Sequence, residues 1–162
     1  MFALRRAAVA APRVLARRGY AEVASASDKL RLSLVLPHET IFTSQDVVQV
    51  NLAAESGDLG VLANHVPSIE ALKPGILEVI EGSANESKKW FVSGGFANVH
   101  PNNTLTVNAV EAYPLDAFSP EAIRSGLAEA QRVAAGSGTE EEKAEAQIEV
   151  SVYEALQAAL KA

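Results

Sequence analysis

The spacing of apolar residues changes abruptly at Tyr113-Pro114, and this change constrains the fold more than any other feature of the sequence. Before it, short segments such as Leu30–Leu36 alternate apolar and polar residues, which is typical of half-buried strands. After it, apolar residues recur at helical spacing. The sequence therefore predicts a two-part α+β fold, in which an N-terminal antiparallel β-sandwich or flattened barrel precedes a C-terminal α-helical hairpin.

Short strands are predicted wherever the alternation holds between turn residues. The predicted strands cover residues 30–36, 39–43, 48–53, 76–81, 88–93, 96–100 and 104–110. Between the third and fourth, Ser56–Gly75 is predicted to form a shaped loop system, because glycines and prolines interrupt its apolar run. The residues predicted to shape turns are Gly57, Gly60, Pro67, Gly94 and Gly95. Three aromatic residues, Trp90, Phe91 and Phe96, are predicted to fill the sandwich.

Two helices are predicted after Ser119, which is a suitable N-cap before Pro120. Gly136–Gly138 separates them, and Thr139 with Glu142 forms a capping box for the second. The predicted apolar stripe of the second helix consists of Ile148, Val152, Ala155, Leu156 and Ala159. Because large apolar side chains are scarce in this hairpin, we expect it to dock on the sheet domain or on another protein.

The first twenty residues contain five arginines and no acidic residue, which is typical of a mitochondrial presequence. Processing is predicted at Tyr20 and Ala21, because Arg18-Gly19-Tyr20 resembles a matrix-peptidase site. The alternative is a disordered basic arm that binds nucleic acid. We therefore expect a presequence (1–20), a flexible lead-in (21–28), a β-sandwich domain (29–114) and a helical hairpin (115–162).

Removal of the presequence leaves nine basic against twenty acidic residues, a net charge of about −11. Such a charge disfavours binding to nucleic acid phosphates. The sequence contains no cysteine, which excludes disulfides and thiolate metal sites. His38, His65 and His100 lack the spacing of a metal-binding motif. No cofactor site is predicted, and an enzyme built on a small β-sandwich stays as a competing hypothesis.

Two sequence motifs carry a family resemblance. The first, GxxGVLxxHxP, spans Gly57–Pro67, and the second is SGGF at Ser93–Phe96. Together they make Leu30–Leu160 resemble the central-stalk subunit of F-type ATP synthases, called delta in mitochondria and epsilon in bacteria and chloroplasts. The resemblance implies a noncatalytic rotor subunit, peripheral on the matrix side of the mitochondrial inner membrane. Its implied partners are the gamma subunit, the membrane rotor ring of c subunits and the small mitochondrial epsilon subunit.

The resemblance also suggests which residues contact the rotor ring. The corresponding edge of the family consists here of Leu62, Ala63, Asn64, His65 and Val66. The structural alternative is that this loop only fixes a bend. Bacterial relatives often carry an I/L-D-x-x-R-A nucleotide-binding motif on the first helix, of which Glu121 and Arg124 are the acid and base present here. A nucleotide-responsive inhibitory subunit that acts through the hairpin is therefore the alternative function, and the incomplete motif disfavours it.

Overall fold

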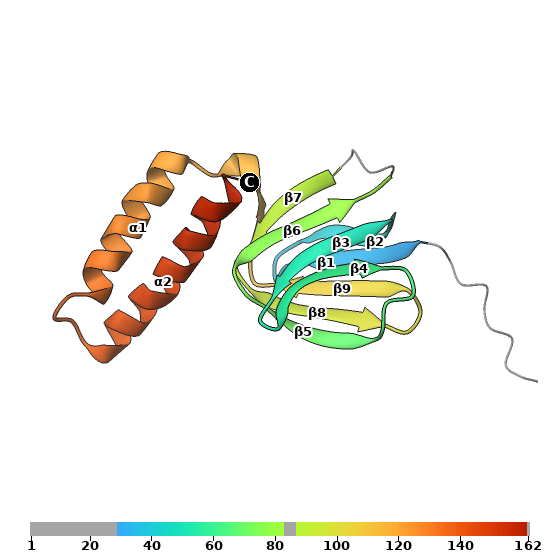
Figure 1. Ribbon diagram of the computed structural model, residues 1–162, viewed down its shortest axis with the longest axis horizontal. Helices are drawn as coiled ribbons and strands as arrows, with labels where there is room; N and C mark the ends of the chain where they lie inside the picture. Colours follow the sequence, from blue (N-terminus) through green and yellow to red (C-terminus); the bar gives the residue numbers. More distant parts are fainter. Residues whose placement is uncertain (1–28, 83–86, 162) are drawn as a thin grey trace, which may run out of the picture.

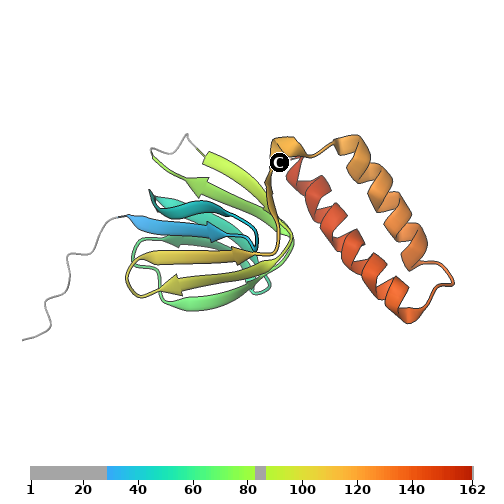
Figure 2. The ribbon, with the colours of Figure 1, turned by 180° about the vertical axis from the view of Figure 1, so that it is seen from behind.

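The computed structural model describes residues 29–82 and 87–161. The predicted presequence, its processing position at Tyr20 and Ala21, and the lead-in (21–28) lie outside the described residues. The described chain forms a curled, ten-stranded sheet with a two-helix hairpin attached at one end (Figure 1). The same arrangement is seen from behind in Figure 2. The predicted two-part α+β fold is confirmed.

The strands are β1 (Leu30–Val35), β2 (Thr40–Val47), β3 (Gln49–Ala54), β4 (Gly57–Leu62), β5 (Ser68–Leu72), β6 (Gly75–Ile80), β7 (Ser87–Val92), β8 (Gly95–His100), β9 (Thr104–Ala109) and β10 (Ala112–Pro114). Their order is β10-β7-β6-β3-β5-β8-β9-β1-β2, and β4 pairs with β3. Strands β1 and β9 run parallel, whereas the other pairings among the described strands are antiparallel.

The expectation of a loop system over Ser56–Gly75 is wrong. This segment contains β4 and β5, joined by a short connection at residues 63–67. Gly60 lies within β4, opposite Asn51 of β3, so its assignment to a turn is also wrong. A Cβ at Gly60 would lie 3.2 Å from the side chains of Asn51 and Gln49, so glycine here makes room for their amides.

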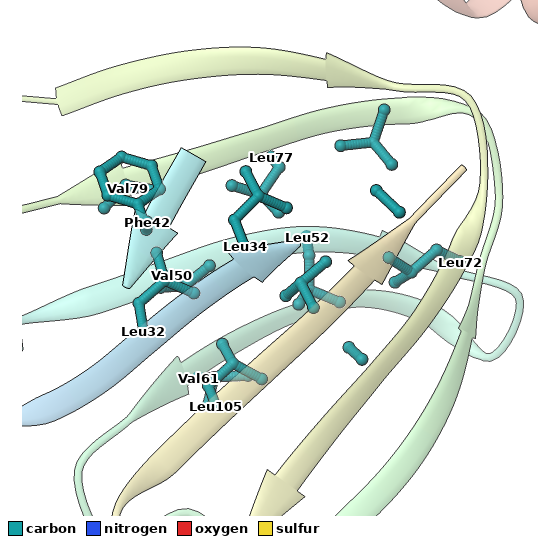
Figure 3. Close-up of a cluster of buried hydrophobic side chains, with 14 of the residues drawn as sticks. Leu32, Leu34, Phe42, Val50, Leu52, Val61, Leu72, Leu77, Val79 and Leu105 are labelled. Carbon is teal, nitrogen blue, oxygen red and sulfur yellow. The ribbon is translucent and has the colours of Figure 1, made fainter. Parts of the chain in front are cut away.

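The alternating apolar residues of the strands meet inside the sandwich (Figure 3). Leu32 and Leu34 of β1, Val50 of β3 and Leu105 of β9 are all fully buried. Burial of each such side chain contributes about 1.5–3 kcal/mol to the free energy of unfolding. The inward faces of the strands therefore hold the sheet closed. Phe42 packs edge-on against Trp90, with ring centroids 4.9 Å apart, and this contact brings β2 against β7.

Only part of the aromatic prediction is correct. Trp90 is half-buried against the core, whereas Phe91 points to the opposite face of β7 and packs under the hairpin. Phe96 is 58% exposed on the outside of β8. Neighbouring residues of a strand face opposite sides, so Ala97 and Val99 take the inward positions of β8 and Phe96 points outward.

The hairpin consists of α1 (Pro120–Ala134) and α2 (Glu140–Ala159), preceded by a short 3-10 helix, η1 (Leu115–Ala117). The predicted caps are confirmed. Ser119 accepts a hydrogen bond from the Ala122 amide at the start of α1. At the start of α2, the Thr139 amide donates to the Glu142 carboxylate at 2.8 Å, and the Glu142 amide donates to Thr139 Oγ1 at 3.2 Å.

The hairpin docks on the sheet domain, as expected. Its buried residues Ile123, Leu156 and Ala159 form a second cluster with Phe91 of β7. Ile148 is predicted to belong to the apolar stripe of α2, but it is 64% exposed. The other predicted stripe residues, Val152, Ala155, Leu156 and Ala159, do pack in this cluster, and Ala146 is also buried, so the predicted stripe is confirmed except at Ile148. No helix within residues 29–82 and 87–161 is long and apolar enough to cross a membrane.

Candidate functional site

The predicted contact residues lie in and beside the β4–β5 connection, at the end of the strands away from the hairpin (Figure 1). Leu62, Asn64 and Val66 are exposed, whereas Ala63 and His65 are half-buried. Val66 is 74% exposed and Leu62 is 46% exposed. The structure thus brings the five predicted residues together on one short surface loop.

Hydrogen bonds give this loop a defined shape. The His65 amide donates to the Leu62 carbonyl at 3.2 Å, which closes a turn. Asn64 is the third residue of that turn and has a φ of 64°. Glycine and asparagine tolerate such a conformation best. The His65 ring Nδ1 lies 2.8 Å from the Val66 carbonyl, and Pro67 directly precedes β5.

The β8–β9 turn, Pro101–Asn103, lies beside this loop. The Asn64 amide donates to Asn103 Oδ1 at 2.7 Å, across a sequence separation of 39 residues. Asn103 also has a positive φ, of 56°. The predicted site does not include this turn. The sequence does contain a signal for this turn, the pair Asn102-Asn103 after Pro101. Asparagine is enriched at turn positions that need a positive φ.

Three of the four glycines predicted to shape turns lie at the other end of the sandwich. Gly57, Gly94 and Gly95 all have positive φ, between 131° and 154°. Gly57 opens β4, and Gly94 and Gly95 precede and open β8. A Cβ at Gly95 would overlap the Asn108 carbonyl oxygen, so this position requires glycine.

Apolar side chains also gather on the outer face of β5 and β8. Ile69 is 72% exposed and lies opposite Asn98, while Phe96 lies opposite Ala71 and Asn108. Val110 follows β9 and is likewise exposed. An apolar patch on a soluble protein often marks a contact with another protein. The sequence prediction misses this face because it places Phe96 in the core.

A groove of about 570 Å³ separates the sheet from the C-terminal end of α2. Its walls include Asn51, Glu78 and Lys89 from the sheet, and Ala155 and Ala158 from α2. Gln49 donates to Asn51 Oδ1 at 2.6 Å, and Asn51 Nδ2 donates to Glu78 Oε2 at 2.9 Å. The hydrogen bond from Asn51 is the main cause of a lowered pKa of the Glu78 carboxyl, and it outweighs the opposing effect of partial burial.

The histidines lie on three connections or strand ends. His38 Nε2 is 3.8 Å from the Glu39 carboxylate, and His100 Nε2 is 3.3 Å from Thr106 Oγ1. His65 belongs to the β4–β5 loop. In the part of the chain that the structure describes, no group of three or more histidine, aspartate or glutamate side chains could hold a metal ion.

Two family descriptions match this chain. Residues 29–114 match the β-sandwich domain of the ATP synthase delta/epsilon chain. Residues 118–158 match the C-terminal domain of the fungal epsilon subunit of F1F0-ATP synthase.

Similar proteins carry consistent names. The chain is 69% identical over 144 residues to ATP synthase subunit delta, mitochondrial, of Agaricus bisporus, covering 89% of this chain and 86% of the relative. It is 58% identical over 158 residues to the protein of the same name from Neurospora crassa, covering 98% and 93%.

Solved structures show the same fold. A chain of the Euglena gracilis mitochondrial ATP synthase structure (OSCP/F1/c-ring, rotational state 1) superposes with a TM-score of 0.80 at 30% identity, covering 87% of each chain. A chain of the Tetrahymena thermophila central stalk/c-ring structure superposes with a TM-score of 0.58 at 18% identity, covering 81% of this chain and 96% of that one, and supports the fold alone.

Proposed function

Because this chain belongs to the delta/epsilon family of ATP synthase subunits, we propose that it is a noncatalytic central-stalk subunit of mitochondrial proton-translocating ATP synthase. It couples rotation of the membrane ring to the gamma subunit and the catalytic head. It is peripheral to the inner membrane, on the matrix side. The observation that carries this proposal is the 69% identity to a mitochondrial delta subunit over 89% of the chain.

Affinity capture of the tagged chain from solubilised mitochondrial membranes tests the assignment as a whole. We expect the gamma subunit and the ring subunits in the eluate, and ATP hydrolysis by the captured complex but not by the isolated chain. Recovery of the chain as a free matrix protein, or hydrolysis by the isolated chain, would contradict the proposal.

The gamma subunit is assigned to the outer face of β5 and β8. Ile69, Phe96 and Val110 are large, exposed side chains held on or beside paired strands, so they can be buried in an interface with little ordering cost. Burial of one such side chain is worth about 1.5–3 kcal/mol, which corresponds to about 10-fold or more in affinity.

We expect Phe96→Asp to weaken capture of gamma by about 10-fold or more for this reason. Ile148→Asp is the matched control, because Ile148 is similarly exposed but lies on the hairpin. Equal capture by the two variants would contradict the assignment of gamma to this face.

The rotor ring is assigned to the Leu62–Val66 loop, which is exposed and held in one shape by its own hydrogen bonds. Surface loops positioned by a rigid scaffold commonly carry binding residues. A double variant, His65→Trp with Val66→Trp, should therefore reduce proton pumping driven by ATP hydrolysis in membranes.

The control is Glu55→Trp, which places one bulky residue in the β3–β4 turn at the opposite end of the sandwich. If Glu55→Trp uncouples pumping from hydrolysis and the loop variant does not, the ring contact lies at the hairpin end and the assignment is refuted.

The small mitochondrial epsilon subunit is assigned to the groove between the sheet and α2. The groove offers a polar floor around Asn51 and Glu78 and a wall of small side chains, which suits an approaching peptide segment. Ala158→Trp should block it and prevent copurification of the small subunit. Ala144→Trp, also on α2 but outside the groove, should not. Equal copurification with both variants would refute the placement.

The alternative function, nucleotide-responsive inhibition, is favoured by one cavity. A space of about 350 Å³ at the base of the hairpin is lined by Arg124 and Lys161, whose charges suit an anion. Titration of the purified chain with ATP decides the matter, and we expect no specific binding. Tight binding that Arg124→Ala abolishes would support the alternative instead.

A further inference from the structure

We infer that Asn103, in the β8–β9 turn, is a positioning residue that fixes the shape of the Leu62–Val66 loop. The loop and the turn are far apart in sequence but are joined by the hydrogen bond from the Asn64 amide to Asn103 Oδ1. The functional consequence of this inference rests on the proposed ring contact. The structural part does not.

The loop depends on this bond because the hydrogen bond that closes its turn does not involve the Asn64 amide. The His65 amide closes the turn on Leu62, and Asn64 sits at the apex with a positive φ. An exposed apex amide normally bonds to water, which does not select one orientation of the peptide. A side-chain oxygen at 2.7 Å does select one.

Asn103 is itself firmly held. Its carbonyl accepts from the Arg31 amide at 2.9 Å, and the Arg31 guanidinium donates to the Asn102 carbonyl at 3.4 Å and to Thr104 Oγ1 at 3.2 Å. Arg31 belongs to β1, which pairs with β9 on one side and β2 on the other. The Asn103 side chain therefore ties the loop to one of the most buried strands of the sandwich.

The residue type fits both requirements of the position. Asn103 ends a three-residue hairpin loop with a φ of 56°, a conformation that glycine supplies most easily. Glycine, however, has no acceptor for the Asn64 amide. Asparagine tolerates the backbone conformation and supplies the oxygen.

The contact surface is consequently composite. The Leu62–Val66 loop and the Pro101–Asn103 turn form one continuous, nearly uncharged edge, with Arg31 as the cation beneath it. Such an edge fits a partner that presents a short polar loop with free backbone carbonyl and amide groups, rather than a strongly basic or acidic surface.

Hydrogen exchange of the Asn64 amide, measured by NMR on the full chain, tests the positioning role. Asn103→Gly keeps the backbone conformation and removes the acceptor, so exchange should accelerate by about 2- to 10-fold, the usual net effect of one hydrogen bond. Asn103→Asp restores an acceptor and should return exchange towards that of the native chain. Asn102→Gly, next to it, should have no effect, because the Asn64 amide bonds to Asn103 and not to Asn102. Unchanged exchange in Asn103→Gly would overturn the inference.

Proton pumping per ATP hydrolysed, in membranes that carry each variant, tests the functional part. We expect a loss in Asn103→Gly that Asn103→Asp reverses. If exchange accelerates in Asn103→Gly while pumping is unchanged, the positioning role stands and the assignment of the ring to this loop fails. If pumping falls without any change in exchange, Asn103 acts by direct contact and the positioning role is refuted.

Discussion

Replacement of Gly95 by alanine should destabilise the sandwich more than any other single methyl insertion in a turn. Gly95 has a φ of 142°, and a Cβ there would overlap the Asn108 carbonyl oxygen and lie 2.9 Å from the Ala109 Cα. The disfavoured backbone conformation costs about 1–3 kcal/mol. Displacement of β9 costs about 1–3 kcal/mol more, for a total of about 2–6 kcal/mol out of a typical 5–15 kcal/mol.

Urea unfolding followed by fluorescence of Trp90, the single tryptophan of the chain, measures this loss. Gly57→Ala is the matched control, because Gly57 has a φ of 131° but, apart from its chain neighbours, no atom lies within 4 Å of the place that a methyl would take. The control should show only the backbone cost of about 1–3 kcal/mol. Equal losses in the two variants would refute the steric part of the argument, and a stable Gly95→Ala variant would refute all of it.

Three further predictions concern the hairpin and the groove. Gly126→Ala should loosen the hairpin by about 0–2 kcal/mol net, because the new methyl would lie 2.7 Å from the Tyr153 hydroxyl oxygen, a clash worth about 1–3 kcal/mol, while alanine favours the helix by about 1 kcal/mol; proteolysis rates measure this. Thr139→Ala should cost about 1 kcal/mol by removing a cap from α2, as measured by thermal unfolding. Asn51→Ala should raise the lowered pKa of Glu78 towards its ordinary value, as followed by an NMR titration. Because the pKa of Glu78 is lowered in the folded state, ionised Glu78 stabilises the fold at pH values above its unfolded pKa. This stabilisation is lost as the pH falls through the folded pKa. The stabilities of the native chain and of Asn51→Ala should therefore converge in acid.

Much of the fold could be predicted from local signals. The alternation of Leu30, Leu32 and Leu34 appears in the structure as a fully buried row on β1. The capping residues Ser119 and Thr139 begin the two helices as expected. These features depend on neighbours along the chain, which is why a single sequence reveals them.

Features that depend on distant partners could not be predicted in the same way. Residue type alone indicates a turn at Gly60, but this glycine occupies a strand where the side chains of Gln49 and Asn51 need space. Size alone favours a core position for Phe96, whereas the register of β8 turns it outward. Ile148 has the right spacing for the apolar stripe, but the part of α2 that packs on the cluster around Phe91 begins only at Val152, so Ile148 stays uncovered. The first error concerns which residues pair in the sheet, and the other two concern which side of an element is covered; both depend on tertiary packing.

The two ends of the sandwich also use different residues for the same backbone problem. At the hairpin end, positive φ values fall on Gly57, Gly94 and Gly95, whereas at the opposite end they fall on Asn64 and Asn103. A search for turns by glycine therefore misses the β4–β5 and β8–β9 connections, which contain none. The asparagines accept the same conformation and retain side chains that can bond to a neighbouring backbone.

Under the proposed function, this difference affects how load passes through the molecule. The loop at the far end is tied through Asn103 to Arg31, and so to β1, whose leucines Leu30, Leu32 and Leu34 are at most 1% exposed. The hairpin instead rests on a small cluster around Phe91 and Leu156. Displacing the loop from Asn103 requires the loss of one hydrogen bond, worth about 0.5–1.5 kcal/mol, whereas displacing the hairpin requires separation of the four buried side chains of this cluster and of those packed against them. Under a load at the far end, the loop should therefore shift before the hairpin separates from the sheet.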